Sequence, residues 1–250
     1  MSMCISPTSK IPCLLLLTFI FLTACSAKTT APSPLLIADS QRLSASVEQA
    51  YWWHSDIHVH WPMGENPDWA VDAMLANEVF APIVMNQSSA PLLWRFHRRA
   101  MRDASGQNFS FIFYASSDRA KEILRKIDAD ETLKQLSSVG IVERVNSGSF
   151  AAAPLPQIEG TSAPGWPPSL QRAWPYFIMG ASATWLDLIR QEAQTAELDR
   201  RDVRTTLEGY RRVSKNIDAI WYEYAQRAFF HHLSAMFAYP EFQMKTELVF

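Results

Sequence analysis

Cysteine is scarce in this sequence, and the few cysteines lie close to its start. The chain of 250 residues has three, Cys4, Cys13 and Cys25, and none follows residue 25. The body after that position therefore has no internal disulfide and no Cys-x-x-Cys motif. Glycine is scarce as well, with eight residues, and neither a phosphate-binding Gly-rich loop nor a dinucleotide-binding fingerprint occurs.

The sequence also lacks a strong net charge and a long apolar run. Lys and Arg number 23 against 25 Asp and Glu, which gives a formal net charge of −2. This balance provides no electrostatic footprint for nucleic acid, and we expect no nucleic-acid partner. The most apolar segment, Leu14–Leu22 (LLLLTFIFL), is shorter than the about 20 residues that a membrane-spanning helix needs. A content of 48% hydrophobic and 19% charged residues is that of an ordinary globular protein.

The apolar segment has the length of the central region of a secretory signal peptide. Lys10 precedes it, no acidic residue lies before it, and it ends in Leu22-Thr23-Ala24-Cys25. These four residues resemble the lipobox of bacterial lipoproteins, in which an apolar residue and two small residues precede the acylated cysteine. The resemblance implies cleavage between Ala24 and Cys25, a diacylglyceryl thioether on Cys25, and a fatty acid such as palmitate on the new amine.

The same resemblance implies where the protein resides. Two or three acyl chains on Cys25 hold a protein durably in a lipid bilayer, whereas a single chain is marginal. Cys4 and Cys13 leave with the predicted signal peptide, residues 1–24. Ser26 follows the acylated position, and the sorting rule of Gram-negative lipoproteins then favours the periplasmic face of the outer membrane over the inner membrane.

Composition divides the rest of the chain into four parts. Residues 25–46 are rich in Ser, Ala, Thr and Pro, and we interpret them as a tether. Residues 148–169 hold five Pro and three Gly, which is typical of a linker or a long loop. Residues 47–147 are predicted to form an α/β region, and residues 170–250 a helical region that either shares its core or has its own. The predicted class is α+β, with a sheet of about three or four strands, packed helices and a mostly helical C-terminal region.

Hydrophobic periodicity predicts the individual elements. Strands are expected at 54–61, 78–85, 108–115 and 140–145, of which the third, almost entirely apolar, is predicted to be central. Helices are expected at 67–76, 88–101, 117–136, 176–194 and 202–238. In the last helix, apolar residues three and four apart predict a core-facing stripe that continues through Trp221, Tyr224 and Ala228 to His231.

Four polar residues alternate along the first predicted strand. His54, Asp56, His58 and His60 share one face, because side chains on a strand alternate with period two. Two imidazoles at this spacing can converge on a zinc or other divalent ion. The segment from Asp56 to His60 resembles the D-x-H-x-H opening of amidohydrolases and PHP-type phosphoesterases, and that resemblance implies metal-dependent hydrolysis.

The rest of the sequence does not predict the barrel of those enzyme families. They carry further ligands at the ends of several later strands. The remaining histidines, His97, His231 and His232, fall in predicted helices. Two interpretations of the strand stay open: a smaller metal site, or a half-exposed polar face whose histidines have no ligand role.

A basic cluster follows in the helix predicted at 88–101. Arg95, Arg98, Arg99 and Arg102 surround His97, and together they can bind an anion such as a phosphate, a lipid head group or a carboxylate. The alternative is a solvated helix face whose arginines pair with carboxylates of the same chain.

Three functional hypotheses result from these features. The first is a non-enzymatic accessory lipoprotein that holds an envelope protein or a glycan, because no complete catalytic set is evident. The second is a metal-dependent hydrolase that acts on an envelope substrate through His58 and His60. The third is a lipoprotein that binds a small molecule or a glycan in an aromatic-lined pocket between the α/β layer and the C-terminal helices, since the chain has nine Trp and fourteen Phe.

Overall fold

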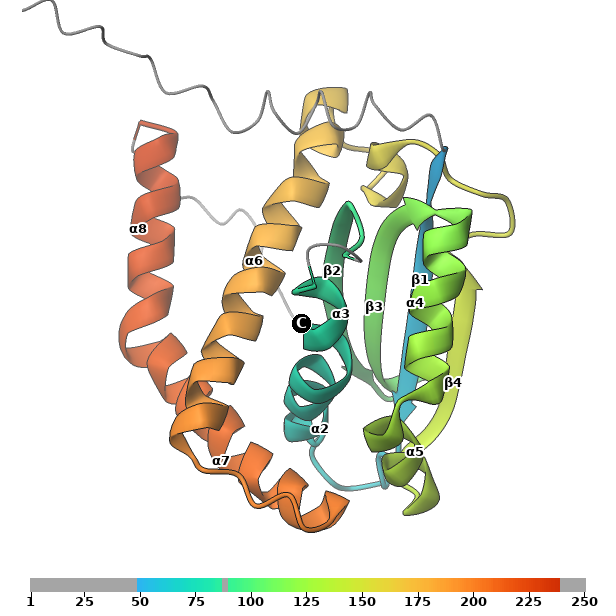
Figure 1. The fold of residues 1–250 in the computed structure, drawn as a ribbon. Helices are drawn as coiled ribbons and strands as arrows, with labels where there is room; N and C mark the ends of the chain where they lie inside the picture. The colour runs from blue at the N-terminus through green and yellow to red at the C-terminus, as the bar shows by residue number, and fades with distance from the viewer. Residues whose placement is uncertain (1–48, 87–89, 239–250) are drawn as a thin grey trace, which may run out of the picture. The chain divides into compact units, whose positions relative to one another are not determined.

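A computed structural model of the chain describes residues 49–86 and 90–238 (Figure 1). All of these residues belong to one compact unit. The predicted signal peptide, Cys25 and the tether lie outside the described residues. Among the described helices, none combines the length and the apolarity that crossing a membrane requires.

Four antiparallel strands form a single sheet. They are β1 (Ala50–Val59), β2 (Leu93–Met101), β3 (Gly106–Ser116) and β4 (Val142–Ser149), in the order β2-β3-β1-β4. The sheet, its packed helices and the helical C-terminal region confirm the predicted α+β class. The strand β3 pairs on both sides, as its nearly continuous apolar sequence indicates.

The helical segments fall into three groups along the chain. The first is a continuous run of α2 (Trp69–Met74), the π-helical turn η1 (Leu75–Phe80) and α3 (Ala81–Val84). The second is α4 (Ser117–Ala129) and α5 (Glu131–Ser138), followed after β4 by the short 3₁₀ turn η2 (Ile158–Thr161). The third is α6 (Pro168–Thr195), α7 (Val203–Ile220), the π-helical turn η3 (Trp221–Ala225) and α8 (Gln226–Met236).

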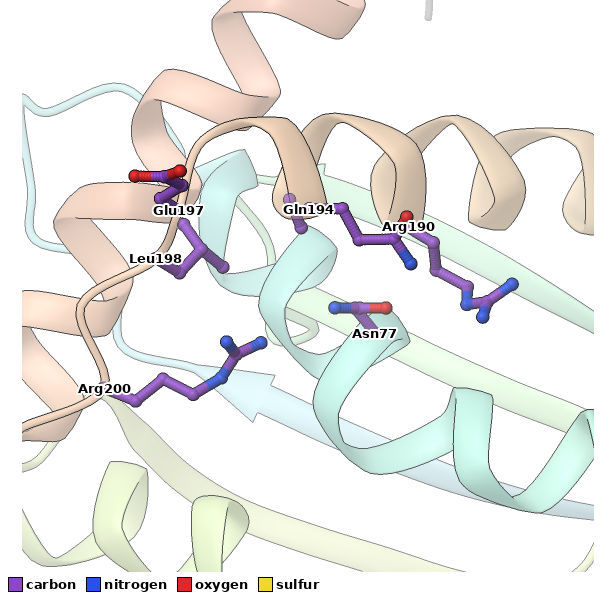
Figure 2. A pocket seen from close by; sticks show the side chains of 7 residues that line it. Asn77, Arg190, Gln194, Glu197, Leu198 and Arg200 are labelled. Atoms are coloured by element: carbon purple, nitrogen blue, oxygen red, sulfur yellow. The ribbon is translucent and has the colours of Figure 1, made fainter.

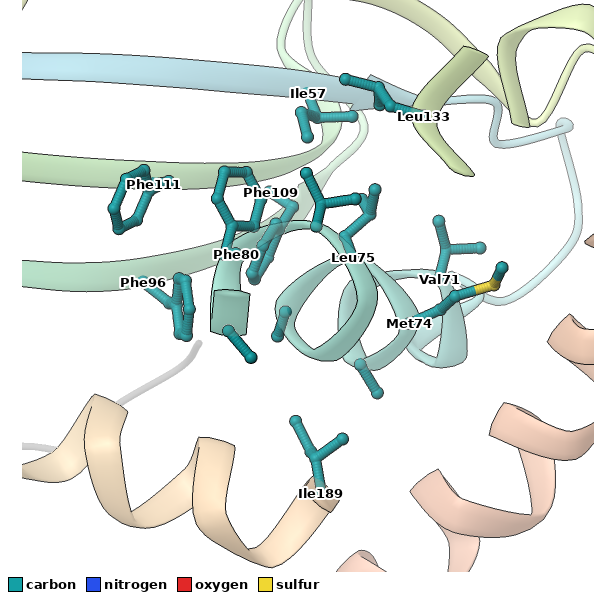
Figure 3. Packing of buried hydrophobic residues seen from close by; sticks show 14 of the residues in the cluster. Ile57, Val71, Met74, Leu75, Phe80, Phe96, Phe109, Phe111, Leu133 and Ile189 are labelled. Atoms are coloured by element: carbon teal, nitrogen blue, oxygen red, sulfur yellow. The ribbon is translucent and has the colours of Figure 1, made fainter. Parts of the chain in front are cut away.

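The main core lies between one face of the sheet and the helices. Phe80 of η1 packs against Phe96, Phe109 and Phe111 of the sheet, with ring centroids 4.8 to 5.9 Å apart (Figure 3). The same cluster includes Ile189 of α6 and buried residues of α7. The helical region and the α/β region therefore share one core.

The strand predicted at 78–85 is wrong, because these residues continue the helix that begins at Trp69. An apolar run of this length is equally compatible with a buried strand and a buried helix. Pro82 lies in the first turn of α3, where the missing N–H group breaks no hydrogen bond of that helix. Val79, Phe80 and Ile83 are buried on the helical face that meets the sheet.

The helix predicted at 88–101 is also wrong, because Leu93–Met101 is the edge strand β2. Leu92, Phe96 and Ala100 suggested a helix through their spacing of four, but a spacing of four is also a multiple of the strand period. Pairing with the phenylalanine-rich β3 makes this segment a strand, and Phe96 lies directly opposite Phe111. The basic residues of this segment therefore divide between the two faces of the sheet.

Two predicted helices are interrupted in the structure. The helix expected at 117–136 ends at Ala129, and Asp130 caps α5 by accepting a hydrogen bond from the backbone N–H of Leu133 at 2.9 Å. The stripe of the last helix is buried up to Ile217 but leaves the core at Trp221, and no residue of α8 is buried. A π-helical turn shifts the phase of a helix, and η3 lies at this point. The prediction that His231 faces the core is wrong for this reason.

Replacing a core phenylalanine tests which face of the sheet is buried in the hydrophobic core. Phe111→Ala should lower the free energy of unfolding by about 3–5 kcal/mol, because the ring is fully buried between Phe80 and its neighbours on the sheet. The exposed Phe177→Ala serves as the control and should change it by no more than about 0.5 kcal/mol. Urea denaturation measures both values, and similar losses for the two variants would contradict this core.

Candidate functional site

Most of the predicted site residues lie on the sheet face that points away from the main core. Along β1, Asp56 is opposite Ser110 of β3 and Asn146 of β4, and the row continues from Ser110 to His97 of β2. We call the alternating set on these four strands the polar sheet face. Its members are His54, Asp56, His58, Arg95, His97, Arg99, Asn108, Ser110, Arg144 and Asn146.

The strand prediction thus brought His54, Asp56 and His58 together correctly, and the structure adds His97 from β2. The three histidines predicted on this strand, however, each have a different partner. His54 Nε2 lies 3.6 Å from Asp56 Oδ2, and the His60 Nδ1 atom lies 2.7 Å from Glu143 Oε1. His58 faces a cation, since its two ring nitrogens lie 3.1 and 3.3 Å from Arg144 Nη2.

This arrangement offers no visible support for the predicted metal site. Within the described ranges, no group of three or more His, Cys, Asp or Glu residues is placed to hold a metal ion. A guanidinium group against His58 also opposes the approach of a divalent cation. The metal site therefore stays a prediction from the sequence.

The pKa values of two histidines of the face, His58 and His97, are lowered. Burial and the Arg144 guanidinium lower the pKa of His58 below 6.5. Burial, followed by Arg95 and Arg99, lowers the pKa of His97 in the same way. The fixed positive charge of the face therefore comes from its arginines.

One end of this face is covered by a strap, which we define as Phe150–Thr161. Trp52 Nε1 donates to the carbonyl oxygens of Gln157 and Ile158, at 3.0 and 3.1 Å, and Tyr114 Oη donates to Pro156 O at 2.6 Å. Beneath it lies a small second core formed by Ala50, Trp52, Leu93, Ile112 and Tyr114. Residues from the predicted linker at 148–169 therefore form a wall beside the polar sheet face.

The wall approaches one arginine of the basic cluster. Arg95 Nη2 donates weakly to Thr161 O, at 3.4 Å. The Arg95 Nε atom and the Thr161 Oγ1 atom are buried and have no hydrogen-bond partner among the described residues.

The predicted basic cluster does not form a single anion site. Arg95 and Arg99 lie on the polar sheet face, but Arg98 points to the helices on the other side. Arg102 follows β2, lies over the Trp61 ring at 3.4 Å from its centroid, and donates to Glu65 O at 2.6 Å. The physical reason is the strand period, which separates neighbours that a helix would have kept on one side.

Arg98 forms an ion pair with a fully buried acid, Asp72. Its Nε atom donates to Asp72 Oδ2 at 2.9 Å, and its guanidinium carbon lies 4.8 and 4.7 Å from the ring centroids of Trp69 and Trp185. Asp72 has no exposed side-chain surface and also accepts from Gln107 Nε2 at 3.3 Å. Burial raises the pKa of Asp72 to about 6, against the opposing effect of Arg98.

The sequence analysis missed Asp72, although the sequence contains a signal for it. Asp72 is a single acidic residue within the apolar segment Trp69–Leu75, and a buried acid needs a partner. A hollow of about 300 Å³ adjoins this ion pair and is lined by Trp69, Arg98, Asp218 and Tyr222. It lies between the α/β layer and the C-terminal helices, which is where the third hypothesis expects an aromatic pocket.

A second hollow, of about 450 Å³, lies at the turn between α6 and α7 (Figure 2). Asn77 of η1 and Arg200 line it, and the Arg200 side chain extends toward Asn77. Arg200 is already paired with Glu78 at 2.9 Å, and Glu78 accepts a short hydrogen bond from the buried Tyr210. Because this network is satisfied internally, we assign it to the attachment of η1 to α7.

No protein-family model, curated protein or solved structure matches the chain.

The Asp72–Arg98 pair predicts a specific pH dependence of stability. The pKa of Asp72 is about 6 in the folded protein and 3.8 for an ordinary aspartate, so the folded state binds more protons between these values. Its contribution to the free energy of unfolding therefore falls as the pH rises from 4 to 7, by roughly 2 kcal/mol.

Asp72→Asn removes this titration. Urea denaturation at constant ionic strength measures the free energy of unfolding of both proteins. The difference, taken as the unaltered protein minus Asp72→Asn, should fall as the pH rises over this range. Asp118→Asn is the control, because the Asp118 side chain is 80% exposed. A difference between the unaltered protein and Asp72→Asn that stays constant, or rises, with pH would show that the assigned pKa direction is wrong.

Proposed function

We propose that the chain is a lipid-anchored, non-enzymatic binding protein of the bacterial cell envelope, which holds an envelope protein or glycan on its polar sheet face. The observation that carries this proposal is the open face itself. An antiparallel sheet can keep one face solvated. Here that face carries ten polar and charged side chains, and the strap is packed beside them.

The charges of the polar sheet face favour an acidic partner. Arg95, Arg99 and Arg144 contribute three guanidinium groups, whereas Asp56 is the single acid among the members of the face. Arg99 is paired with Asp103 across exposed surface, at 2.7 Å, and such a pair is weak and exchangeable. Guanidinium groups bind carboxylates and phosphates through paired hydrogen bonds, so the partner should carry one of these groups.

The anchor is the other half of the proposal. Its support is the sequence from Leu14 to Cys25, in which an apolar segment too short to span a bilayer leads directly into the lipobox-like residues. The periplasmic face of the outer membrane is the proposed location, because Ser26 follows the acylated position.

Acylation is tested by expressing the full chain in a Gram-negative host with labelled palmitate. The unaltered chain should take up the label and fractionate with membranes, and mass spectrometry should find the acylated cysteine at the new N-terminus. Cys25→Ser should lose label and membrane fractionation. Cys13→Ser is the matched control and should behave like the unaltered chain, because position 13 leaves with the signal peptide. Equal labelling of Cys25→Ser and the unaltered chain would refute the anchor.

Partner binding is tested by site-specific photo-crosslinking in living cells. Benzoylphenylalanine at the exposed position of His97 should give a discrete adduct, because this side chain lies on the polar sheet face. The adduct should weaken strongly when Arg99→Glu and Arg144→Glu are added, since charge reversal repels an acidic partner. Benzoylphenylalanine in place of Ser137, which is exposed on α5, is the control. The polar sheet face is not the binding surface if position 97 gives no adduct, or only the adducts seen at position 137.

A further inference from the structure

Exposed apolar side chains gather on the C-terminal helices. Of the fifteen large apolar side chains that are exposed among the described residues, ten lie on α6, η3 and α8, and an eleventh, Phe237, directly follows α8. Phe177 of α6 is 49% exposed, and Met236 and Phe237 at the end of α8 are 75% and 73% exposed. Monomeric soluble proteins rarely expose apolar groups together, and such groupings mark contacts with proteins or membranes.

These helices reach the same end of the unit in Figure 1. The first residues of β1, the first turns of α6 and the last turn of α8 all lie at the top of the view, whereas α5 lies at the bottom. We define the apolar end by six exposed side chains on α6, α8 and the residue after α8. They are Leu170, Tyr176, Phe177, Leu233, Met236 and Phe237.

The two segments that form the apolar end carry charges of one sign, and the nearest acid that contacts them is Glu159 of η2, 4.0 Å from Arg172. Between residues 160 and 186, which include the first half of α6, Arg172 is the only charged residue. Between residues 224 and 238, which include α8, Arg227 is the only Lys, Arg, Asp or Glu. A chain with 25 acidic residues thus excludes them from both segments. Aromatic and apolar side chains accompanied by cations are the composition that favours the surface of an anionic bilayer.

The proposed anchor brings this end within reach of lipid. Twenty-three residues separate Cys25 from Gln49, the first described residue, and β1 begins at the next position, at the apolar end. Even fully extended, a chain of this length spans at most about 80 Å. Confinement near the bilayer makes docking intramolecular, so an interaction too weak to recruit a free protein becomes populated.

We propose that, in the anchored protein, the apolar end lies on an anionic lipid surface, with side chains such as Phe177 and Met236 in the headgroup region. This inference rests on the proposed lipid anchor and extends it from a single attachment to a defined orientation. The aromatic rings of α6 and the last turn of α8 contact lipid, while Arg172, near the start of α6, meets its phosphates.

The cysteine content of the chain makes a clean test possible. No cysteine follows residue 25, and the Cys25 thiol is consumed by acylation, so one introduced cysteine is the only site for a thiol-reactive dye. Phe177→Cys and Met236→Cys are exposed positions that place the dye at the apolar end. Ser137→Cys, exposed on α5, places it at the opposite end and is the matched control.

The acylated full chain carrying a nitrobenzoxadiazole dye is reconstituted into vesicles of phosphatidylglycerol and phosphatidylcholine, with or without nitroxide-labelled lipid. Interfacial side chains lie about 5–10 Å inside the headgroup boundary, so the nitroxide should quench the dye about twofold or more at positions 177 and 236. Position 137 should show no quenching. Phe177→Glu added to Met236→Cys should reduce quenching at position 236, while the acyl mass stays unchanged.

The outcomes separate this inference from the proposed anchor. Absence of the acyl mass refutes the anchor, and this orientation with it. Acylated protein that shows no quenching at positions 177 and 236, or equal quenching at all three positions, refutes the orientation alone. Dye shielding at 177 and 236 that depends on protein concentration and not on lipid would assign the apolar end to a second copy of the chain, and this also overturns the inference.

Discussion

The buried carboxylate of Asp72 is the constraint on which the arrangement of the sheet depends. A carboxylate without exposed surface must be protonated or paired, and Asp72 of α2 is paired with Arg98 of β2 and bonded to Gln107 of β3. The ring of Trp185, from α6, packs against the guanidinium, whose carbon lies 4.7 Å from the ring centroid. One ion pair thus joins α2 and α6, which are far apart in the sequence, to the neighbouring strands β2 and β3.

This pair also determines the composition of the opposite face. Side chains on a strand alternate, so a strand that turns Arg98 toward α2 must turn His97 and Arg99 the other way. A slip of one residue in β2 would place those two side chains in the core and leave Phe96 in solvent. The polar sheet face is therefore a consequence of the packing on the helical side, and the strap over Trp52 limits it at one end.

The sequence predicted the features that depend on local pattern and missed those that depend on pairing. The apolar strand β3 and the shared face of His54, Asp56 and His58 follow from alternation alone. The nature of the segment around Phe96 did not, because a spacing of four fits both a helix and a strand. The sequence did not predict the partner of His58 either. Arg144 lies 86 residues later, and only the register of β4 against β1 places it beside His58. No local sequence pattern predicts a π-helical turn such as η3 either. This turn places the last residues of the predicted core-facing stripe, including His231, outside the core.

The two proposed surfaces are compatible in space. The strand β1 starts at the apolar end and runs away from it, so Ala50 and Trp52 lie nearest that end and His58 lies farther along. The strap covers the nearer part of the outer sheet face, where the side chains are apolar, and leaves the farther, polar part open. A body resting on lipid by its apolar end would then hold Asp56, His58 and Arg144 away from the bilayer, where an envelope partner can reach them. The phase change at η3 turns α8 out of the core and exposes Met236 at the proposed lipid contact, while the strap covers the apolar part of the outer sheet face.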